Sequence, residues 1–222
     1  MSDTQTDLLT ADNCAVLFID LQPQMAFGTI NIDTQTLKNN VVALAKSAKV
    51  FGVPAFVTSV ETESFSGFVW PELLDVYPGQ DILERSSMNS WDDQKVRDAI
   101  GGTGRKKLIL SGLWTEVCIN LCAFSALADG YEVYVVADAC GGTSPVAHEV
   151  SMQRMIQAGV RPLTWQQTLL EWQRDWANKE TYDPVLDVVR EHSGVYGMGV
   201  DYAYTMVHKA DQRAQNSGKV IK

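Results

Sequence analysis

Three polar residues stand at the ends of apolar runs whose pattern is typical of buried β-strands. Asp20 ends the run AVLFID, Arg85 follows the weaker run DIL, and Cys118 follows KKLILSG within a few residues. A carboxylate at a strand end can serve as a general base, and a thiolate is a strong nucleophile. Each residue also has an ordinary structural interpretation, since Asp20 can cap a turn, Arg85 can lie in solvent, and most free cysteines are small buried hydrophobes. Taken singly, none of the three decides between these alternatives.

The surroundings of Cys118 favour a reactive thiol. The segment from Ile119 to Leu127 has helical spacing, so Cys118 falls in or just before the first helical turn. Unpaired backbone N–H groups and the helix dipole stabilise a thiolate there, which predicts a lowered pKa for Cys118. Cys122 lies one turn further along and is the better candidate for a packed core cysteine. A dyad between Cys118 and His148 is a further alternative.

Apolar runs and helical periodicities alternate along the chain. The runs predict strands over residues 15–19, 53–58, 107–111, 132–137 and 161–165, with a weaker strand near residues 81–83. Helical periodicity predicts helices over residues 34–51, 92–101, 117–129, 146–158 and 166–178. Strands that are apolar on both faces and separated by helices predict a parallel, doubly wound α/β sandwich, in which ligands bind at the carboxyl ends of the strands.

Composition narrows the classes of protein and partner. The chain has 222 residues, of which 45% are hydrophobic and 20% charged, and a net charge of -9. This balance is typical of a globular protein, and the negative charge disfavours binding to nucleic acid or anionic membranes. The N-terminal residues lack the pattern of a signal peptide, and four cysteines without CxxC spacing are best interpreted as reduced thiols. We therefore expect a cytoplasmic protein that acts on a small molecule.

The alternation of strands and helices ends before the C-terminus. Residues 180–222 include the glycine- and tyrosine-rich stretch HSGVYGMGVDYAYTMVH and a basic, polar end. A frayed tail is one interpretation, but it would leave four large side chains as exposed apolar surface. These are Tyr196, Tyr202, Tyr204 and Met206. We therefore expect one domain over residues 1–179 and a C-terminal extension over residues 180–222 that packs on neighbouring subunits.

Taken together, three spaced motifs resemble the isochorismatase-like cysteine hydrolases, a family that includes nicotinamidases and N-carbamoyl amidases. In that family an Asp ends the first strand, a Lys precedes a short (S/N)A(F/W) segment, and a Cys closes a G-x-x-T-x-x-C turn. Asp20, Arg85 and Cys118 take the three key places, Asn89 to Trp91 match the short segment, and the turn runs from Gly112. The resemblance covers about residues 13–175. The later stretch EVYVVADACGGTS is similar to the YcaC-like branch, which implies a six-stranded parallel sheet and a homo-oligomer such as an octamer.

The sequence departs from the family pattern at two places. Arg85 replaces the usual Lys, and because arginine is effectively always protonated its implied role is electrostatic. The nicotinamidase metal cluster of Asp and His also has no counterpart, because the stretch TSVETESFSGFVWPEL has no histidine and only Glu61 and Glu63 nearby. We therefore expect no metal, no cofactor and no nicotinamidase activity.

The resemblance implies hydrolysis of an amide or related C–N bond through a thioester on Cys118, with Asp20 as the base. It also implies an oxyanion hole formed by the backbone N–H groups of Trp114 and Cys118, with a cis peptide bond before Trp114. Expected substrate contacts come from Phe27, Asn89, Trp91 and Trp114. The alternative from another functional class is a non-catalytic or redox-responsive oligomer that retains the fold and a reactive thiol. A flavin or nucleotide carrier is disfavoured, because no glycine-rich turn follows the first strand.

Overall fold

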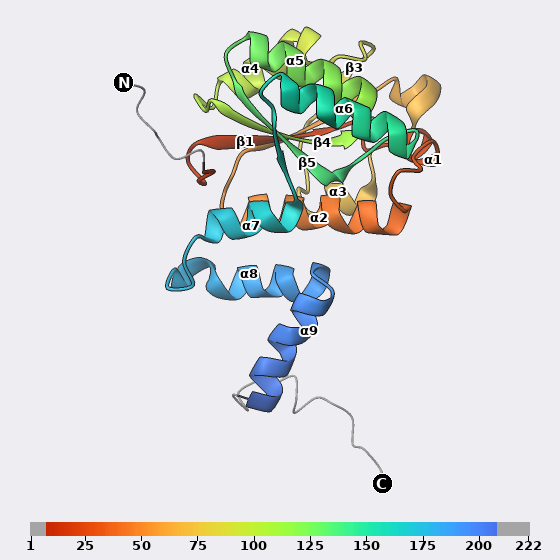
Figure 1. Ribbon diagram of the computed structural model, residues 1–222. Coiled ribbons are helices and arrows are strands. Elements are labelled where there is room, and N and C mark those ends of the chain that lie inside the picture. Colours follow the sequence, from red (N-terminus) through yellow and green to blue (C-terminus); the bar gives the residue numbers. More distant parts are fainter. Residues whose placement is uncertain (1–7, 208–222) are drawn as a thin grey trace.

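A six-stranded sheet forms the centre of the computed structural model, which describes residues 8–207 (Figure 1). All strand pairs are parallel, and the order across the sheet is β3-β2-β1-β4-β5-β6. The strands are β1 (Cys14–Ile19), β2 (Ala55–Val60), β3 (Ile82–Arg85), β4 (Lys107–Leu113), β5 (Glu132–Gly141) and β6 (Arg161–Leu163). This architecture confirms the predicted doubly wound α/β fold.

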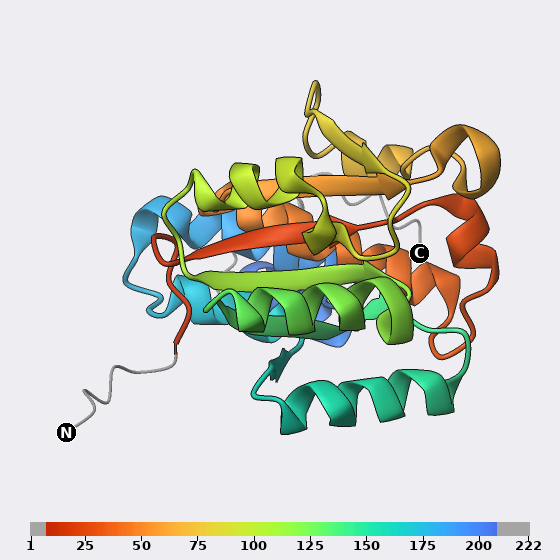
Figure 2. The same ribbon diagram turned by 90° about the horizontal axis from the view of Figure 1, so that it is seen from above.

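Helices cover both faces of the sheet (Figures 1 and 2). One face carries α4 (Gln94–Gly101), α5 (Asn120–Ala128) and α6 (Pro145–Gln157); the other carries α2 (Thr34–Val50), α3 (Pro71–Leu74) and α7 (Trp165–Gln173). Shorter elements are α1 (Pro23–Phe27), the π-helical turns η1 (Thr62–Ser66), η3 (Thr115–Ile119) and η4 (Ala203–Val207), and the 3₁₀ turn η2 (Ser90–Asp92). The central strands are apolar on both faces because they are buried on both, as all six residues of β1 show.

Two further helices follow the predicted domain. Helix α8 (Lys179–His192) packs on α2 and α7, and α9 (Val195–Tyr202) continues away from the body of the protein (Figure 1). Residues of one face of α8 are buried, namely Val185, Leu186, Val188 and Val189. The predicted extension over residues 180–222 therefore begins inside a helix that belongs to the packed core, while its residues 208–222 lie outside the described range. Among the helices described, none is long and apolar enough to span a membrane.

The order of the strands reverses between β1 and β4. The chain runs outward from β1 to β2 and β3, then returns to β4 and runs outward to β5 and β6. At such a switch point the loops after the two central strands diverge and leave room for a ligand at the carboxyl edge. Gly112 allows close approach there, because a Cβ atom at this residue would lie 1.9 Å from the carbonyl oxygen of Ile19. The fold thus brings the ends of β1 and β4 together.

Candidate functional site

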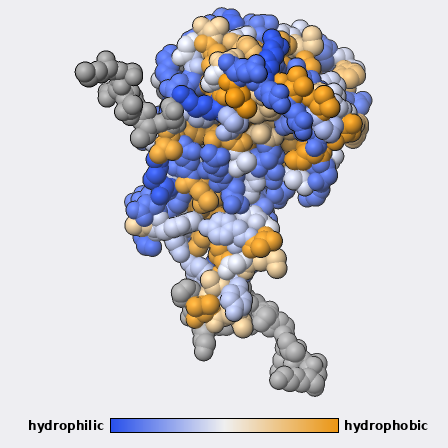
Figure 3. Space-filling view, in the orientation of Figure 1, coloured by the Kyte–Doolittle hydropathy of each residue, from blue (hydrophilic) through white to orange (hydrophobic). Residues whose placement is uncertain are grey.

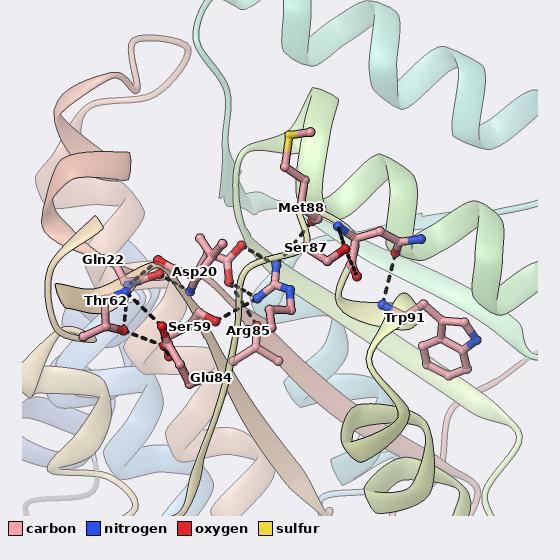
Figure 4. A network of polar contacts seen from close by, with 12 residues as sticks. Asp20, Gln22, Ser59, Thr62, Glu84, Arg85, Ser87, Met88 and Trp91 are labelled. Atoms are coloured by element: carbon pink, nitrogen blue, oxygen red, sulfur yellow. Dashed lines mark hydrogen bonds and ion pairs between the residues drawn. The ribbon is translucent and has the colours of Figure 1, made fainter. Parts of the chain in front are cut away.

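Asp20 and Arg85 form a buried ion pair at this edge (Figure 4). Nη1 of Arg85 donates to Oδ1 of Asp20 at 2.7 Å, and Nη2 donates to Oδ2 at 2.7 Å. The side chains of Asp20 and Arg85 are 0% and 2% exposed. A third hydrogen bond comes from Thr58 Oγ1, which donates to Oδ1 at 3.1 Å. This two-pronged geometry fixes the orientation of the carboxylate and offsets its negative charge.

Backbone geometry sets both partners of the pair. Asp20 follows β1 with a φ of 54°, a left-handed conformation that aspartate adopts more readily than most residues. Arg85 is the last residue of β3, and its guanidinium also donates to the carbonyl oxygens of Ser59 at 3.0 Å and Met88 at 3.3 Å (Figure 4). Burial opposes the charge of Arg85, but the hydrogen bonds and charge of Asp20 outweigh it and raise the pKa of Arg85. The guanidinium is therefore a permanent cation.

Cys118 lies beside this pair within η3, and its side chain is almost fully buried. Burial raises the pKa of Cys118, and the charge and hydrogen bonding of Asp20 raise it further. Arg85 and the backbone of Trp114 act in the opposite direction but do not prevail. The sequence-based prediction of a lowered pKa is therefore wrong, because it considered the helix terminus and the cation but not the burial of the thiol. The resting thiol keeps its proton, and a base must take that proton before Cys118 can attack a carbonyl.

The peptide bond between Leu113 and Trp114 is cis, which confirms the expectation for that bond. The indole of Trp114 is held by α1, because its Nε1 donates to the carbonyl oxygen of Met25 at 2.7 Å. A Cβ atom at Gly28 would lie 2.9 Å from the ring of Trp114, so glycine allows the indole to pack against the end of α1. The turn between β4 and Cys118 is thus anchored on α1, which follows β1 on the other side of the switch point.

The Cys118 side chain lines a pocket of about 240 Å³. Most of the wall is apolar and comes from Met25, Val60, Phe65, Met88, Trp114 and Val117. The remaining lining residues are Glu61, Ser66, Ser86 and Cys118. A larger and more open groove of about 610 Å³ shares Glu61 and Ser86 with this pocket but does not include the thiol. The smaller pocket is therefore the better candidate for a site where a substrate meets Cys118.

Three of the expected substrate contacts lie outside this pocket. Phe27 is 78% exposed at the end of α1, while Trp91 is buried and donates from Nε1 to Asp129 at 2.7 Å. Asn89 caps η2 and donates to Asp92 at 2.8 Å and Ser125 at 3.0 Å. Asn89 and Trp91 therefore have structural partners, and of the four expected contacts only Trp114 lines the pocket.

The remaining predictions concern Cys122, His148 and the absence of a metal ion. Cys122 is fully buried in the core, one turn beyond Cys118. Nδ1 of His148 lies 2.8 Å from Oγ1 of Thr115, so this nitrogen of His148 is engaged with the threonine of the G-x-x-T-x-x-C turn. Within residues 8–207 no three His, Cys, Asp or Glu side chains gather in a way that would hold a metal ion. The absence of a metal or cofactor stays a prediction.

Gln22 is a buried residue near Asp20 that sequence reasoning missed, and it holds a loop that lines the pocket. Its side chain is buried; Oε1 accepts from the backbone N–H of Val60 at 2.9 Å, and Nε2 donates to the carbonyl oxygen of Gly67 at 2.6 Å. Gln22 thereby ties the chain after β1 to both ends of the loop that carries η1 (Figure 4). The sequence contains one signal that could have pointed to Gln22, namely a polar residue two places after Asp20 in the segment LQPQ.

Comparisons with known proteins identify the family and support the fold. A family profile described as the isochorismatase domain matches residues 14–167. A probable hydrolase, YcaC from Escherichia coli strain K12, is 34% identical over 171 residues, which are 77% of this chain and 82% of the relative. The E. coli YcaC structure, described as an octameric hydrolase of unknown specificity, superposes with a TM-score of 0.87 at 30% identity and covers 92% of this chain and 100% of its own.

A second solved structure is similar to the same degree. YcaC from Pseudomonas aeruginosa, with hexane-2,5-diol and covalent acrylamide, has a TM-score of 0.85 at 30% identity and covers 90% of this chain and 98% of its own. The family profile spans more than half of the chain, and the similarity to YcaC extends over most of both proteins. The chain therefore belongs to the isochorismatase family of hydrolases.

Proposed function

We propose that the protein is a cysteine hydrolase that cleaves an amide or related C–N bond of a small molecule through a thioester on Cys118. The observation that carries the proposal is the placement of a buried carboxylate, fixed by two hydrogen bonds from Arg85, beside a thiol that lines a small pocket. A nucleophile next to a base that a third group orients is the general arrangement of covalent catalysis.

The proposed reaction has two halves. Asp20 takes the proton of Cys118 as the sulfur bonds to the carbonyl carbon, and then gives that proton to the nitrogen as the C–N bond breaks and the amine leaves. Water next attacks the thioester while Asp20 takes its proton, which returns to the sulfur as the S–C bond breaks and the carboxylic acid leaves. Proton transfer of this kind contributes typically about 10²–10⁴-fold to rate. The raised pKa of Cys118 fits this order of events, because the thiol needs a base at the moment of attack.

Arg85 acts in this scheme as a fixed charge. Because it keeps its proton, it cannot shuttle one, and its two hydrogen bonds instead hold the carboxylate in register with the thiol. The backbone N–H groups of Trp114 and Cys118 are the proposed donors to the negatively charged oxygen that forms on the carbonyl. Such a preorganised donor is worth on the order of 3 kcal/mol in other enzymes.

The relatives support both the proposed covalent bond to the protein and the proposed hydrolase activity. YcaC from P. aeruginosa holds covalently bound acrylamide, an electrophile that carries a carboxamide, and E. coli YcaC is described as a hydrolase of unknown specificity. A redox-responsive role is less well supported, because oxidation of cysteine follows exposure and thiolate character. Cys118 is 2% exposed and its pKa is raised.

We also propose that the chain forms a homo-oligomer, by analogy with the octamer of E. coli YcaC. Helix α9 and η4 project from the body of the protein and carry apolar side chains on their surface (Figure 3). Val195, Met198, Tyr202 and Met206 are 84%, 71%, 62% and 63% exposed. Exposed apolar side chains gathered on a projecting element are typical of a protein interface, and light scattering of the purified chain tests the assembly.

An activity screen tests the proposed reaction. Small amides, ureido acids and carbamoyl amines are incubated with the wild-type protein, Cys118→Ala and the matched control Cys122→Ala. We expect hydrolysis by the wild-type and Cys122→Ala proteins and none above background by Cys118→Ala. Full activity in Cys118→Ala would show that another residue is the nucleophile.

A further inference from the structure

The charge of the pocket is of one sign, negative. Among the described residues that line it, Glu61 is the one with a charged side chain at neutral pH. The ion pair of Asp20 and Arg85 is buried and electrically balanced. A ligand in the pocket therefore meets an apolar wall, the thiol of Cys118, two serine side chains and one carboxylate.

The backbone of Glu61 is held firmly at the pocket rim. Its φ of 49° is left-handed, which is uncommon for a residue other than glycine. Its N–H donates to the carbonyl oxygen of Arg85 at 3.1 Å, and its own carbonyl oxygen accepts from Phe65 at 2.9 Å and from Ser66 at 3.0 Å. Gln22 anchors both ends of the same loop. The backbone that carries the carboxylate is thus fixed by the loop, at a conformation that glycine would adopt with less strain.

The approach to the pocket is also mainly acidic, because Arg85, the one basic residue among the described residues that line the open groove, is paired with Asp20. Glu61 lies between the small pocket and the open groove, and Glu63 and Glu84 also line the groove. Both Glu84 and Glu61 accept hydrogen bonds within this region: Glu84 from the backbone N–H of Thr62 and the hydroxyl groups of Ser59 and Thr62, and Glu61 at Oε2 from the hydroxyl group of Ser64. These carboxylates, together with the net charge of -9 on the whole chain, favour the approach of a cation over that of an anion.

We propose that the substrate is a small amide with an apolar body and a protonated amine at its far end, and that Glu61 is the residue that selects this amine. The inference rests on the proposed function, because it assumes that the carbonyl group is held at Cys118. A substrate with a carboxylate at its far end would instead place two negative charges together at the rim.

The volume of the pocket limits the size of this substrate. At roughly 30 Å³ per water molecule, 240 Å³ corresponds to about eight waters. Pockets for drug-sized ligands measure about 300–1,000 Å³. The pocket is therefore suited to a molecule on the order of eight to ten non-hydrogen atoms, such as a short aliphatic amide with one terminal amine.

The test uses three pentanamides that differ only at the far carbon, which carries an ammonium, a methyl or a carboxylate group. Their kcat/KM values are measured with the wild-type protein, Glu61→Gln and Glu63→Gln. Glu63 is the matched control, because it belongs to the same loop and lines the groove but not the pocket. A charged hydrogen bond is worth about 1.5–3 kcal/mol, so we expect the wild type to prefer the ammonium over the methyl compound by roughly tenfold or more.

Glu61→Gln should abolish this preference, and Glu63→Gln should keep it within about twofold. Equal preferences in the wild-type and Glu61→Gln proteins would overturn the inference, as would an equal loss in Glu63→Gln. Glu61→Gly provides a second variant, because glycine suits a φ of 49° and should fold at least as well while losing the preference.

A binding measurement separates this inference from the proposed function. The same three compounds are tested for protection of Cys118 against alkylation by iodoacetamide, which requires no turnover. Protection by the ammonium compound that disappears in Glu61→Gln would support the inference even if no amide were hydrolysed. Hydrolysis of all three compounds with the same kcat/KM would support the proposed function and overturn the inference.

Discussion

Replacing Asp20 by asparagine is expected to lower the free energy of unfolding of the protein. Asp20 and Arg85 are buried together, and removal of one partner from a buried ion pair costs about 3–5 kcal/mol, because the other charge is left without compensation. Asparagine keeps one oxygen that can accept a hydrogen bond from Arg85, so we expect the lower end of this range, about 3 kcal/mol. Urea unfolding of the wild-type and Asp20→Asn proteins measures this difference.

The same substitution should move the ionisation and the turnover of Cys118 in opposite directions. Asp20 raises the pKa of Cys118 through its charge and hydrogen bonding, whereas Arg85 lowers it and stays in place. Two charges at hydrogen-bonding distance interact by roughly 4 kcal/mol at an effective dielectric constant of 20. Since about 1.4 kcal/mol changes an equilibrium tenfold, the thiolate fraction near neutral pH should rise at least about tenfold. Turnover should nevertheless fall by about 10²–10⁴-fold, because the base is missing.

The assay follows alkylation of Cys118 by iodoacetamide as a function of pH, with peptide mapping to separate this thiol from the other three. In Asp20→Asn the apparent pKa from the alkylation rates should lie below that of the wild type. Hydrolysis of any amide identified by the screen is measured on the same samples, with urea unfolding as evidence that the variant is folded. An apparent pKa that rises in folded Asp20→Asn, or turnover that persists, would refute the reasoning.

Four further changes test other parts of the structure. Arg85→Lys should retain activity within about tenfold, because an ammonium group still compensates the charge of Asp20. It should lower the free energy of unfolding by about 1–2 kcal/mol, because the second hydrogen bond to Asp20 is lost. Inactivity in a folded variant would contradict an electrostatic role for Arg85. Gly112→Ala should lose more than about 4 kcal/mol or fail to fold, because its Cβ would overlap the carbonyl oxygen of Ile19. Gly199→Ala, in open space on α9, should be neutral or stabilising by about 0.5–1 kcal/mol in the same unfolding measurement, and equal losses would contradict this account. Alkaline pH should destabilise the fold, because the core thiols lose their protons at a lower pH in the unfolded chain than in the folded protein. Urea unfolding should give a nearly constant free energy between about pH 7 and 8 and a fall of up to about 1.4 kcal/mol per pH unit for each thiol between about pH 9 and 11, and a flat profile up to about pH 11 would contradict this reasoning. Burial raises the pKa of these thiols from 9.0 to about 11 for Cys14 and to about 12 for Cys122 and Cys140.

The sheet followed from local patterns in the sequence, whereas the pairing of Asp20 with Arg85 followed from the family resemblance. Buried parallel strands are apolar on both faces, and their carboxyl ends share one edge, so polar residues at those ends have to lie near one another. The pattern also located most strands and helices to within a few residues. Helix α8 was missed because its buried positions, such as Val185 and Val189, lie in a segment interrupted by polar residues and Pro184.

Features that depend on tertiary contacts could not be predicted from local sequence patterns. The pKa of Cys118 depends on how deeply the thiol is buried, which no spacing rule reports. The indole of Trp91 bonds to Asp129, a residue 38 positions away, and so does not line the pocket. Glu61 was considered only as a metal ligand, because its place on the pocket rim depends on a left-handed turn after β2. Contacts with the substrate are therefore the part of the site that sequence patterns indicate least well.

Capture of the covalent intermediate tests the central claim most directly. The wild-type protein is mixed with a hydrolysed amide, quenched in acid during turnover, and analysed by intact mass and peptide mapping. We predict one acyl group on Cys118 that hydroxylamine removes, the same adduct on Cys122→Ala, and none on Cys118→Ala. An acyl group on a different residue, or steady hydrolysis by Cys118→Ala, would contradict the assignment of Cys118 as the nucleophile.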